Sequence, residues 1–183
     1  KYDMFILEDD GRVDEQIFNE YTSLNLRYPP RFTQVSNGDD AMKELKTNRY
    51  ELIICMPNMD NSEVFELSKK IKETYPEIPI VILTPFSKEV TKILEKEDLT
   101  GVDYVFSWLG DTDLLLAIIK LIEDRMNVEH DVKTVGVQTI MVVEDSVRFY
   151  SSMLPMLYKF VLYESKEFSK EALNDHLRML RMR

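Results

Sequence analysis

The chain of 183 residues has one cysteine, five glycines and no long hydrophobic run. It therefore lacks the cysteine pairs of many extracellular domains and the apolar length of a membrane-spanning helix. A single cysteine, Cys55, cannot form a disulfide within the chain, so we expect a reducing compartment and a cytoplasmic location. The longest unbroken apolar run, 114–119, is much shorter than the roughly 20 residues of a transmembrane helix. We therefore expect no membrane association.

Positive charge is also scarce, since 23 Lys and Arg face 33 Asp and Glu, for a net charge of −10. This balance argues against a nucleic-acid-binding surface. The negative charge is distributed unevenly along the chain. Residues 138–183 hold seven basic and six acidic residues, a net charge of +1, which leaves −11 for residues 1–137. Such a shift in composition predicts a domain boundary near residue 137.

Short apolar runs alternate with helical patterns along residues 1–128. The runs predict strands at 4–7, 32–35, 52–55, 80–83 and 102–106. Strands that are apolar throughout are typical of parallel strands buried on both faces. We therefore predict an α/β domain with a doubly wound, five-stranded parallel sheet, whose ligand site lies beyond the carboxyl ends of the strands.

A second unit follows a predicted linker at 129–137. The run Ile140-Met141-Val142-Val143-Glu144-Asp145 has the same form as Phe5-Ile6-Leu7-Glu8-Asp9, an apolar strand that ends in Glu-Asp, and a helical pattern follows both. Residues 138–183 therefore look like the start of a second, incomplete unit of the same kind that is mostly helical.

Several segments together resemble the receiver domain of bacterial two-component response regulators. They are the Glu8-Asp9 pair, Tyr50–Ile54, the helix Phe65–Glu73, Ile78–Thr84 and Gly101–Tyr104. The resemblance implies a flavodoxin-like fold. It also implies an acidic pair that binds Mg²⁺, an Asp after the third strand that accepts a phosphoryl group, a hydroxyl and an aromatic side chain that relay the change, and a Lys that contacts the phosphoryl group.

The chain matches only some of the functional positions of the receiver family. Glu8 and Asp9 match the acidic pair, and Thr84 and Tyr104 match the switch hydroxyl and aromatic residue (all by resemblance). In the register without gaps, however, the acceptor position holds Met56, and the Lys position holds Ser107. Methionine has no nucleophilic oxygen and is a poor Mg²⁺ ligand, and serine carries no positive charge.

We therefore expect a degenerate receiver, or pseudo-receiver: a regulatory module in signal transduction without catalysis or a required cofactor. Glu8 and Asp9 would be a vestigial metal site that does not hold Mg²⁺ tightly. The partners of the module would be other proteins or other domains of a longer chain, or a second copy bound through residues 138–183 or helix 111–126.

Two alternatives remain open. One is an active phosphorelay receiver that uses an unusual acceptor such as Asp10 or Asp60. The other is the regulatory N-terminal part of a pyruvate phosphate dikinase or phosphoenolpyruvate-synthase-type enzyme, which segment 103–110 and the restart at Glu144-Asp145 resemble. In that case the catalytic chemistry would lie outside these residues.

Overall fold

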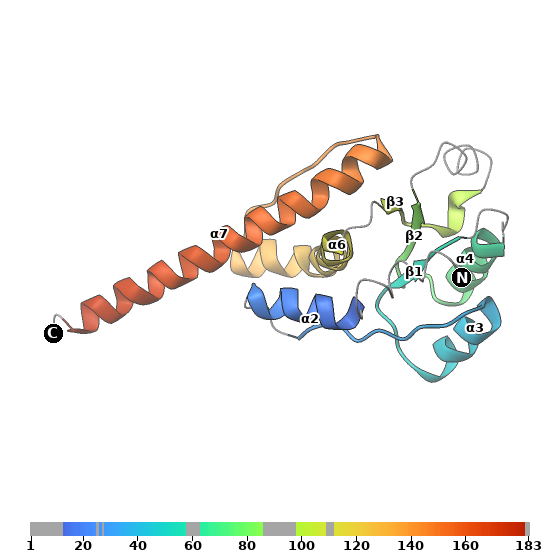
Figure 1. The fold of residues 1–183 in the computed structure, drawn as a ribbon, viewed down its shortest axis with the longest axis horizontal. Coiled ribbons are helices and arrows are strands. Elements are labelled where there is room, and N and C mark those ends of the chain that lie inside the picture. Colours follow the sequence, from blue (N-terminus) through green and yellow to red (C-terminus); the bar gives the residue numbers. More distant parts are fainter. Residues whose placement is uncertain are drawn as a thin grey trace.

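The computed structural model describes residues 13–24, 26, 28–57, 63–85, 98–108 and 112–181. It contains a parallel sheet with helices on both sides and one long helix that extends away from the sheet (Figure 1). The strands are β1 (Ile53–Cys55), β2 (Ile80–Pro85) and β3 (Tyr104–Trp108), in the order β1-β2-β3. The helices are α2 (Val13–Ser23), α3 (Gly38–Thr47), α4 (Glu63–Thr74), η1 (Leu99–Gly101), α6 (Asp113–His130), η2 (Asp131–Val135) and α7 (Val147–Arg181).

The prediction of an α/β fold with a parallel sheet is confirmed, but the described sheet has three strands and not five. The predicted strand at 4–7 lies outside the described residues. The predicted strand at 32–35 is wrong, because this segment is exposed and pairs with none of the described strands. Phe32 and Val35 are its only strongly apolar side chains, so pairing would bury little apolar surface.

Side chains of β2 alternate between two apolar clusters. Ile80 packs in a cluster with Leu45 of α3 and Ile71 of α4. Val81 and Leu83 belong to a larger cluster built with α2, α6 and α7 (Figure 1). Successive side chains of a strand point to opposite faces, so the continuous apolar run at 80–83 serves both layers.

Helix α6 supplies half of the buried residues of the larger cluster, namely residues 114–119. Most of the segment 129–137, which the sequence predicted to be a linker without regular structure, is helical. α6 continues to His130 and then through the π-helical turn η2. The helical path ends at Gly136, whose φ of 78° is a conformation that glycine adopts without strain.

The predicted strand at 140–143 is wrong. Residues 136–146 form no regular secondary structure, and Ile140, Met141 and Val143 are 69%, 89% and 88% exposed. A strand needs a neighbour that accepts its backbone hydrogen bonds, and no described strand pairs with this segment. An apolar sequence alone is therefore not sufficient to make this segment a strand.

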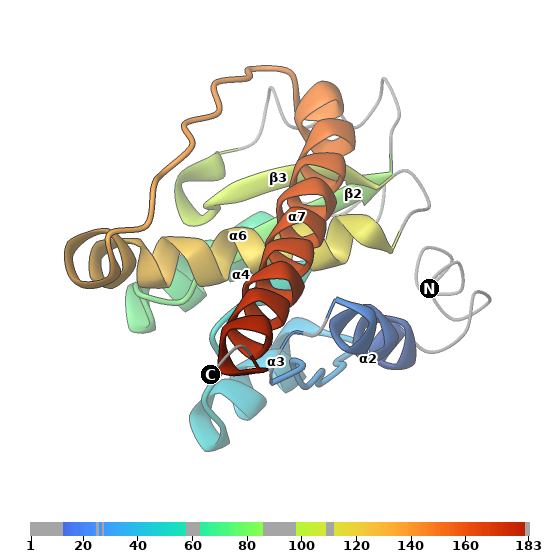
Figure 2. The same cartoon turned by 90° about the vertical axis from the view of Figure 1, so that its left-hand side faces the viewer.

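Helix α7 packs on β3 and α6 of its own chain (Figure 2). Leu154 of α7 is 3% exposed and lies in the larger cluster, and Leu121 of α6 packs against the same cluster. Leu114 is also buried there. The apolar flank of helix 111–126 is thus covered within the chain, which corrects the prediction that this flank is open to a second copy. Among the described residues, no helix is both long and apolar enough to cross a bilayer.

Candidate functional site

Three of the predicted site residues lie at or just beyond the carboxyl ends of the three strands. Met56 directly follows β1, Thr84 is in β2, and Ser107 is in β3. Thr84 and Ser107 are paired across the sheet in register. The sequence-based placement of these side chains at one edge of the sheet is consistent with this topology.

Met56 is a packing residue in this structure. It is partly buried and packs against the larger apolar cluster, as do Leu52 and Ile54. These residues alternate along one strand direction, so they share a face of the sheet. A thioether in that position contributes contact area and offers no oxygen for phosphoryl transfer.

Ser107 is linked to α7 through its backbone. Its N–H donates a hydrogen bond to Oγ of Ser151 over 2.8 Å, and that hydroxyl donates to the carbonyl oxygen of Val147 over 2.6 Å. Both serines are buried, at 3% and 1% exposure. Among the described residues, Ser107 Oγ has no hydrogen-bond partner. A small hydroxyl beneath a docked helix thus occupies the position where the resemblance calls for a lysine.

The two predicted switch residues are both packed. Thr84 is 3% exposed. The ring of Tyr104 is partly buried, with its centroid 6.3 Å from that of Phe106, and the guanidinium of Arg125 lies 5.8 Å from the Tyr104 ring centroid. In this arrangement Tyr104 belongs to the contact between the sheet and its covering helices.

Asp103, directly before β3, is a polar hub that the sequence reading did not single out. Its carboxylate contacts Lys72 of α4 at 2.7 Å and Arg125 of α6 at 3.2 Å, and it accepts a 2.8 Å hydrogen bond from the N–H of Ile80. Partial burial raises the pKa of Asp103, but the hydrogen bonds from Lys72 and Ile80 outweigh it and leave the pKa lowered. Asp103 thereby ties the sheet to helices on both faces.

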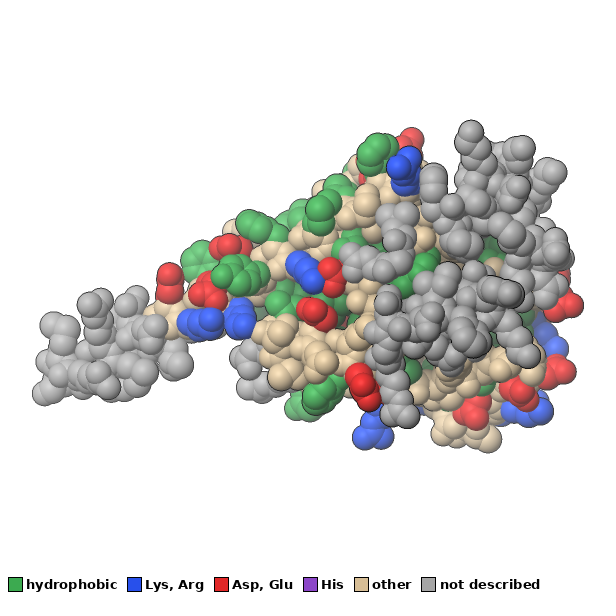
Figure 3. Space-filling model, viewed as in Figure 1, with side chains coloured by type: hydrophobic (Ala, Val, Ile, Leu, Met, Phe, Trp, Pro, Cys, Tyr) green, Lys and Arg blue, Asp and Glu red, His purple; other side chains and the backbone are tan. Residues whose placement is uncertain are grey.

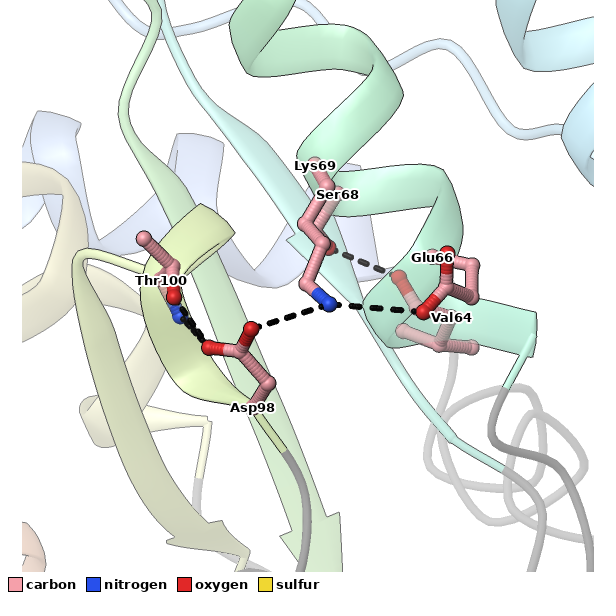
Figure 4. A network of polar contacts seen from close by, with 6 residues as sticks. All are labelled: Val64, Glu66, Ser68, Lys69, Asp98 and Thr100. Atoms are coloured by element: carbon pink, nitrogen blue, oxygen red, sulfur yellow. Dashed lines mark hydrogen bonds and ion pairs between the residues drawn. The ribbon is translucent and has the colours of Figure 1, made fainter.

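A second polar network joins α4 to η1 (Figure 4). Lys69 contacts Asp98 at 3.1 Å and Glu66 at 3.3 Å, and Asp98 accepts hydrogen bonds from both the backbone and the hydroxyl of Thr100. The bonds from Thr100 and then Lys69 lower the pKa of Asp98 to about 2. Next to it, a Cβ on Gly101 would lie 2.6 Å from the Lys69 backbone nitrogen, so only glycine permits this approach.

Aromatic side chains fasten α7 to the sheet and to α6. Tyr150 stacks on Phe106 with centroids 5.1 Å apart, and the hydroxyl of Tyr158 donates to Asp124 of α6 over 2.7 Å. Burial, aided by the nearby Tyr104, raises the pKa of Tyr150 to about 12. Local sequence pattern does not predict these contacts, because Tyr150 and Phe106 lie 44 residues apart in the chain.

Glu8 and Asp9, together with the alternative acceptors Asp10 and Asp60, lie outside the described residues. Within the described ranges, no three His, Cys, Asp or Glu side chains gather in a way that could hold a metal ion.

Comparison with known proteins gives the family. No curated protein matches the chain. The family model described as "Response regulator receiver domain" matches residues 5–119, which is more than half of the 183 residues. That span includes β1, β2, β3 and the buried first part of α6. The chain therefore belongs to the response regulator receiver domain family.

Proposed function

We propose that this receiver domain is a regulatory interaction module that does not accept a phosphoryl group at the position its family normally uses. The observation that carries the proposal is the pair Met56 and Ser107. Met56 packs against the apolar cluster directly after β1, and Ser107 is buried beneath α7. In this account the domain acts through the surfaces it presents to other proteins or domains and has no catalytic activity of its own.

The same pair bears on metal binding. A tight Mg²⁺ site needs several oxygen ligands, of which a carboxylate at position 56 would be one. With Met56 there, Glu8 and Asp9 would be left as the only acidic ligands that the resemblance supplies. We propose that they are vestigial and that the domain requires no cofactor.

Beryllofluoride with Mg²⁺ tests the proposal, because this phosphoryl mimic needs an acceptor oxygen. We expect no change in the thermal unfolding midpoint of the native protein, since a ligand that does not bind cannot stabilise. The matched variant is Met56→Asp with Ser107→Lys, which restores both the missing oxygen and the missing positive charge and is expected to gain a shift that depends on Mg²⁺. A rise of several degrees in the unmodified protein would contradict the proposal.

The two alternative functions rest on different observations. A receiver with an unusual acceptor requires phosphorylation on Asp10 or Asp60, and acidic side chains at those positions are what favours it. A regulatory role beside a dikinase-type catalytic region rests on the resemblance of segment 103–110 and on the restart at Glu144-Asp145. In both our proposal and the second alternative, the partner is a protein surface.

A further inference from the structure

Helix α7 carries an exposed apolar stripe that nothing in the site uses. It consists of Phe149, Met153, Met156, Phe160 and Tyr163, hereafter the outer stripe. Four of these side chains are strongly exposed: Phe149 and Met156 at 66%, Phe160 at 64% and Tyr163 at 55%. Figure 3 shows hydrophobic side chains gathered along the upper side of this helix. Exposed apolar surface of this kind marks an interaction site.

The body of the domain occupies the opposite side of the same helix. Ser151, Leu154 and Tyr158 make the contacts with β3 and α6. At 100° per residue, these three lie about half a turn away from Phe149 and Phe160. The outer stripe can therefore meet a second large surface without a clash with the body of its own chain.

The spacing of the outer stripe fits another helix. Its residues follow one another at intervals of four, three, four and three, which is the seam of a two-helix coiled coil. A seam with this repeat is complementary to a second copy of itself. We infer that α7 pairs with α7 of a second copy of this chain, side by side and parallel, through the outer stripe.

Charged residues beside the outer stripe favour a parallel over an antiparallel orientation of the two α7 helices. In a parallel pair, a residue flanking the seam faces the residue five positions later in the other copy, which places Lys159 near Glu164 and Lys166 near Glu171 of the second copy. An antiparallel pair would place Lys near Lys and Glu near Glu. Lys159 already contacts Asp113 at 2.6 Å, but Lys166 donates to the neutral carbonyl of Ser23, so that contact leaves its charge uncompensated.

The surface area that the two α7 helices would bury indicates a modest affinity of the dimer. A large side chain buries roughly 150–250 Å² when it is covered completely, so the exposed parts of four such side chains amount to about 500 Å² per copy. Two copies would bury about 1,000 Å², near the lower limit of specific interfaces. The dimer is therefore expected to form and dissociate with protein concentration.

This inference names the partner of the proposed interaction module, and so rests on that function, but its test does not involve phosphorylation. Sedimentation velocity on the full chain should show a monomer that converts to a dimer as concentration rises. Phe160→Glu should weaken the dimer at least about tenfold, because it places a charge in the seam. Phe168→Glu is the matched control, since Phe168 is 68% exposed on the same helix but about a quarter turn off the stripe.

A chain that stays monomeric at high concentration would overturn the inference, and so would an equal effect of the two Phe→Glu variants. Because both side chains are exposed, neither variant should change the thermal midpoint at a concentration where the chain is monomeric, and Met156→Glu provides a second test within the stripe. Phe149→Cys and Tyr163→Cys address direction. Each should form a disulfide with its own kind in a parallel dimer, whereas cross-links formed only between the two variants would refute the parallel arrangement.

Discussion

The hydrogen bond between Ser107 and Ser151 is the most specific link between α7 and the sheet, and removing it has a calculable cost. Ser151→Ala deletes the hydroxyl that accepts the Ser107 N–H at 2.8 Å. That N–H lies in a buried contact, so it would stay unpaired, at a cost of about 1–3 kcal/mol. For a chain of this length, each kcal/mol corresponds to a fall of about 2–4 °C in the thermal midpoint. We therefore expect a decrease of about 2–12 °C.

Ser152→Ala is the matched control for this prediction. Its hydroxyl donates to the carbonyl oxygen of Phe149 within the same helix, over 3.0 Å. Replacing it should change the free energy of unfolding by less than about 0.5 kcal/mol. Urea denaturation followed by circular dichroism compares both variants with the parent protein. If Ser151→Ala proves as mild as Ser152→Ala, α7 is not docked on β3 as described.

The remaining predictions concern ionisable groups. The lowered pKa of Asp103 means that its ionised form stabilises the fold at neutral pH, and that this contribution disappears as pH falls below the unfolded value of about 3.9. Urea midpoints of Asp103→Asn should lie below those of the parent protein at pH 7 and approach them in acid, and a gap that does not depend on pH would contradict this. Cys55 is partly exposed as a residue, yet burial raises the pKa of its thiol to about 11. It should react slowly with a disulfide reagent at neutral pH until urea unfolds the chain, and rapid labelling of the native protein would refute this.

The sequence predicted the parts of the fold that depend on local pattern. The continuous apolar run at 80–83 identified β2 because both of its faces are buried. The stripe of Leu115, Ile118, Ile119, Ile122 and Met126 identified α6, although Met126 is 57% exposed. The same logic failed at 32–35 and 140–143. An apolar or β-prone run becomes a strand only beside another strand, and that condition depends on distant residues.

The candidate site was predictable to a similar degree. Met56, Thr84 and Ser107 could be assigned to strand ends because strand boundaries follow local pattern. Their surroundings could not be predicted, because the Ser107 contact comes from Ser151, 44 residues later in the chain. The Asp103 hub was missed for the same reason, since two of its partners, Lys72 and Arg125, lie 31 residues before it and 22 residues after it.

Intact-protein mass spectrometry after incubation with acetyl phosphate and Mg²⁺ shows whether the native chain can be phosphorylated. If Met56 and Ser107 have removed the family's phosphorylation chemistry, the mass of the native chain stays unchanged. The double variant Met56→Asp with Ser107→Lys serves as the positive comparison, since it restores an acceptor oxygen at the end of β1 and a positive charge in β3. A gain of one phosphoryl group by the unmodified protein, whether on Asp10, Asp60 or another residue, would contradict the account.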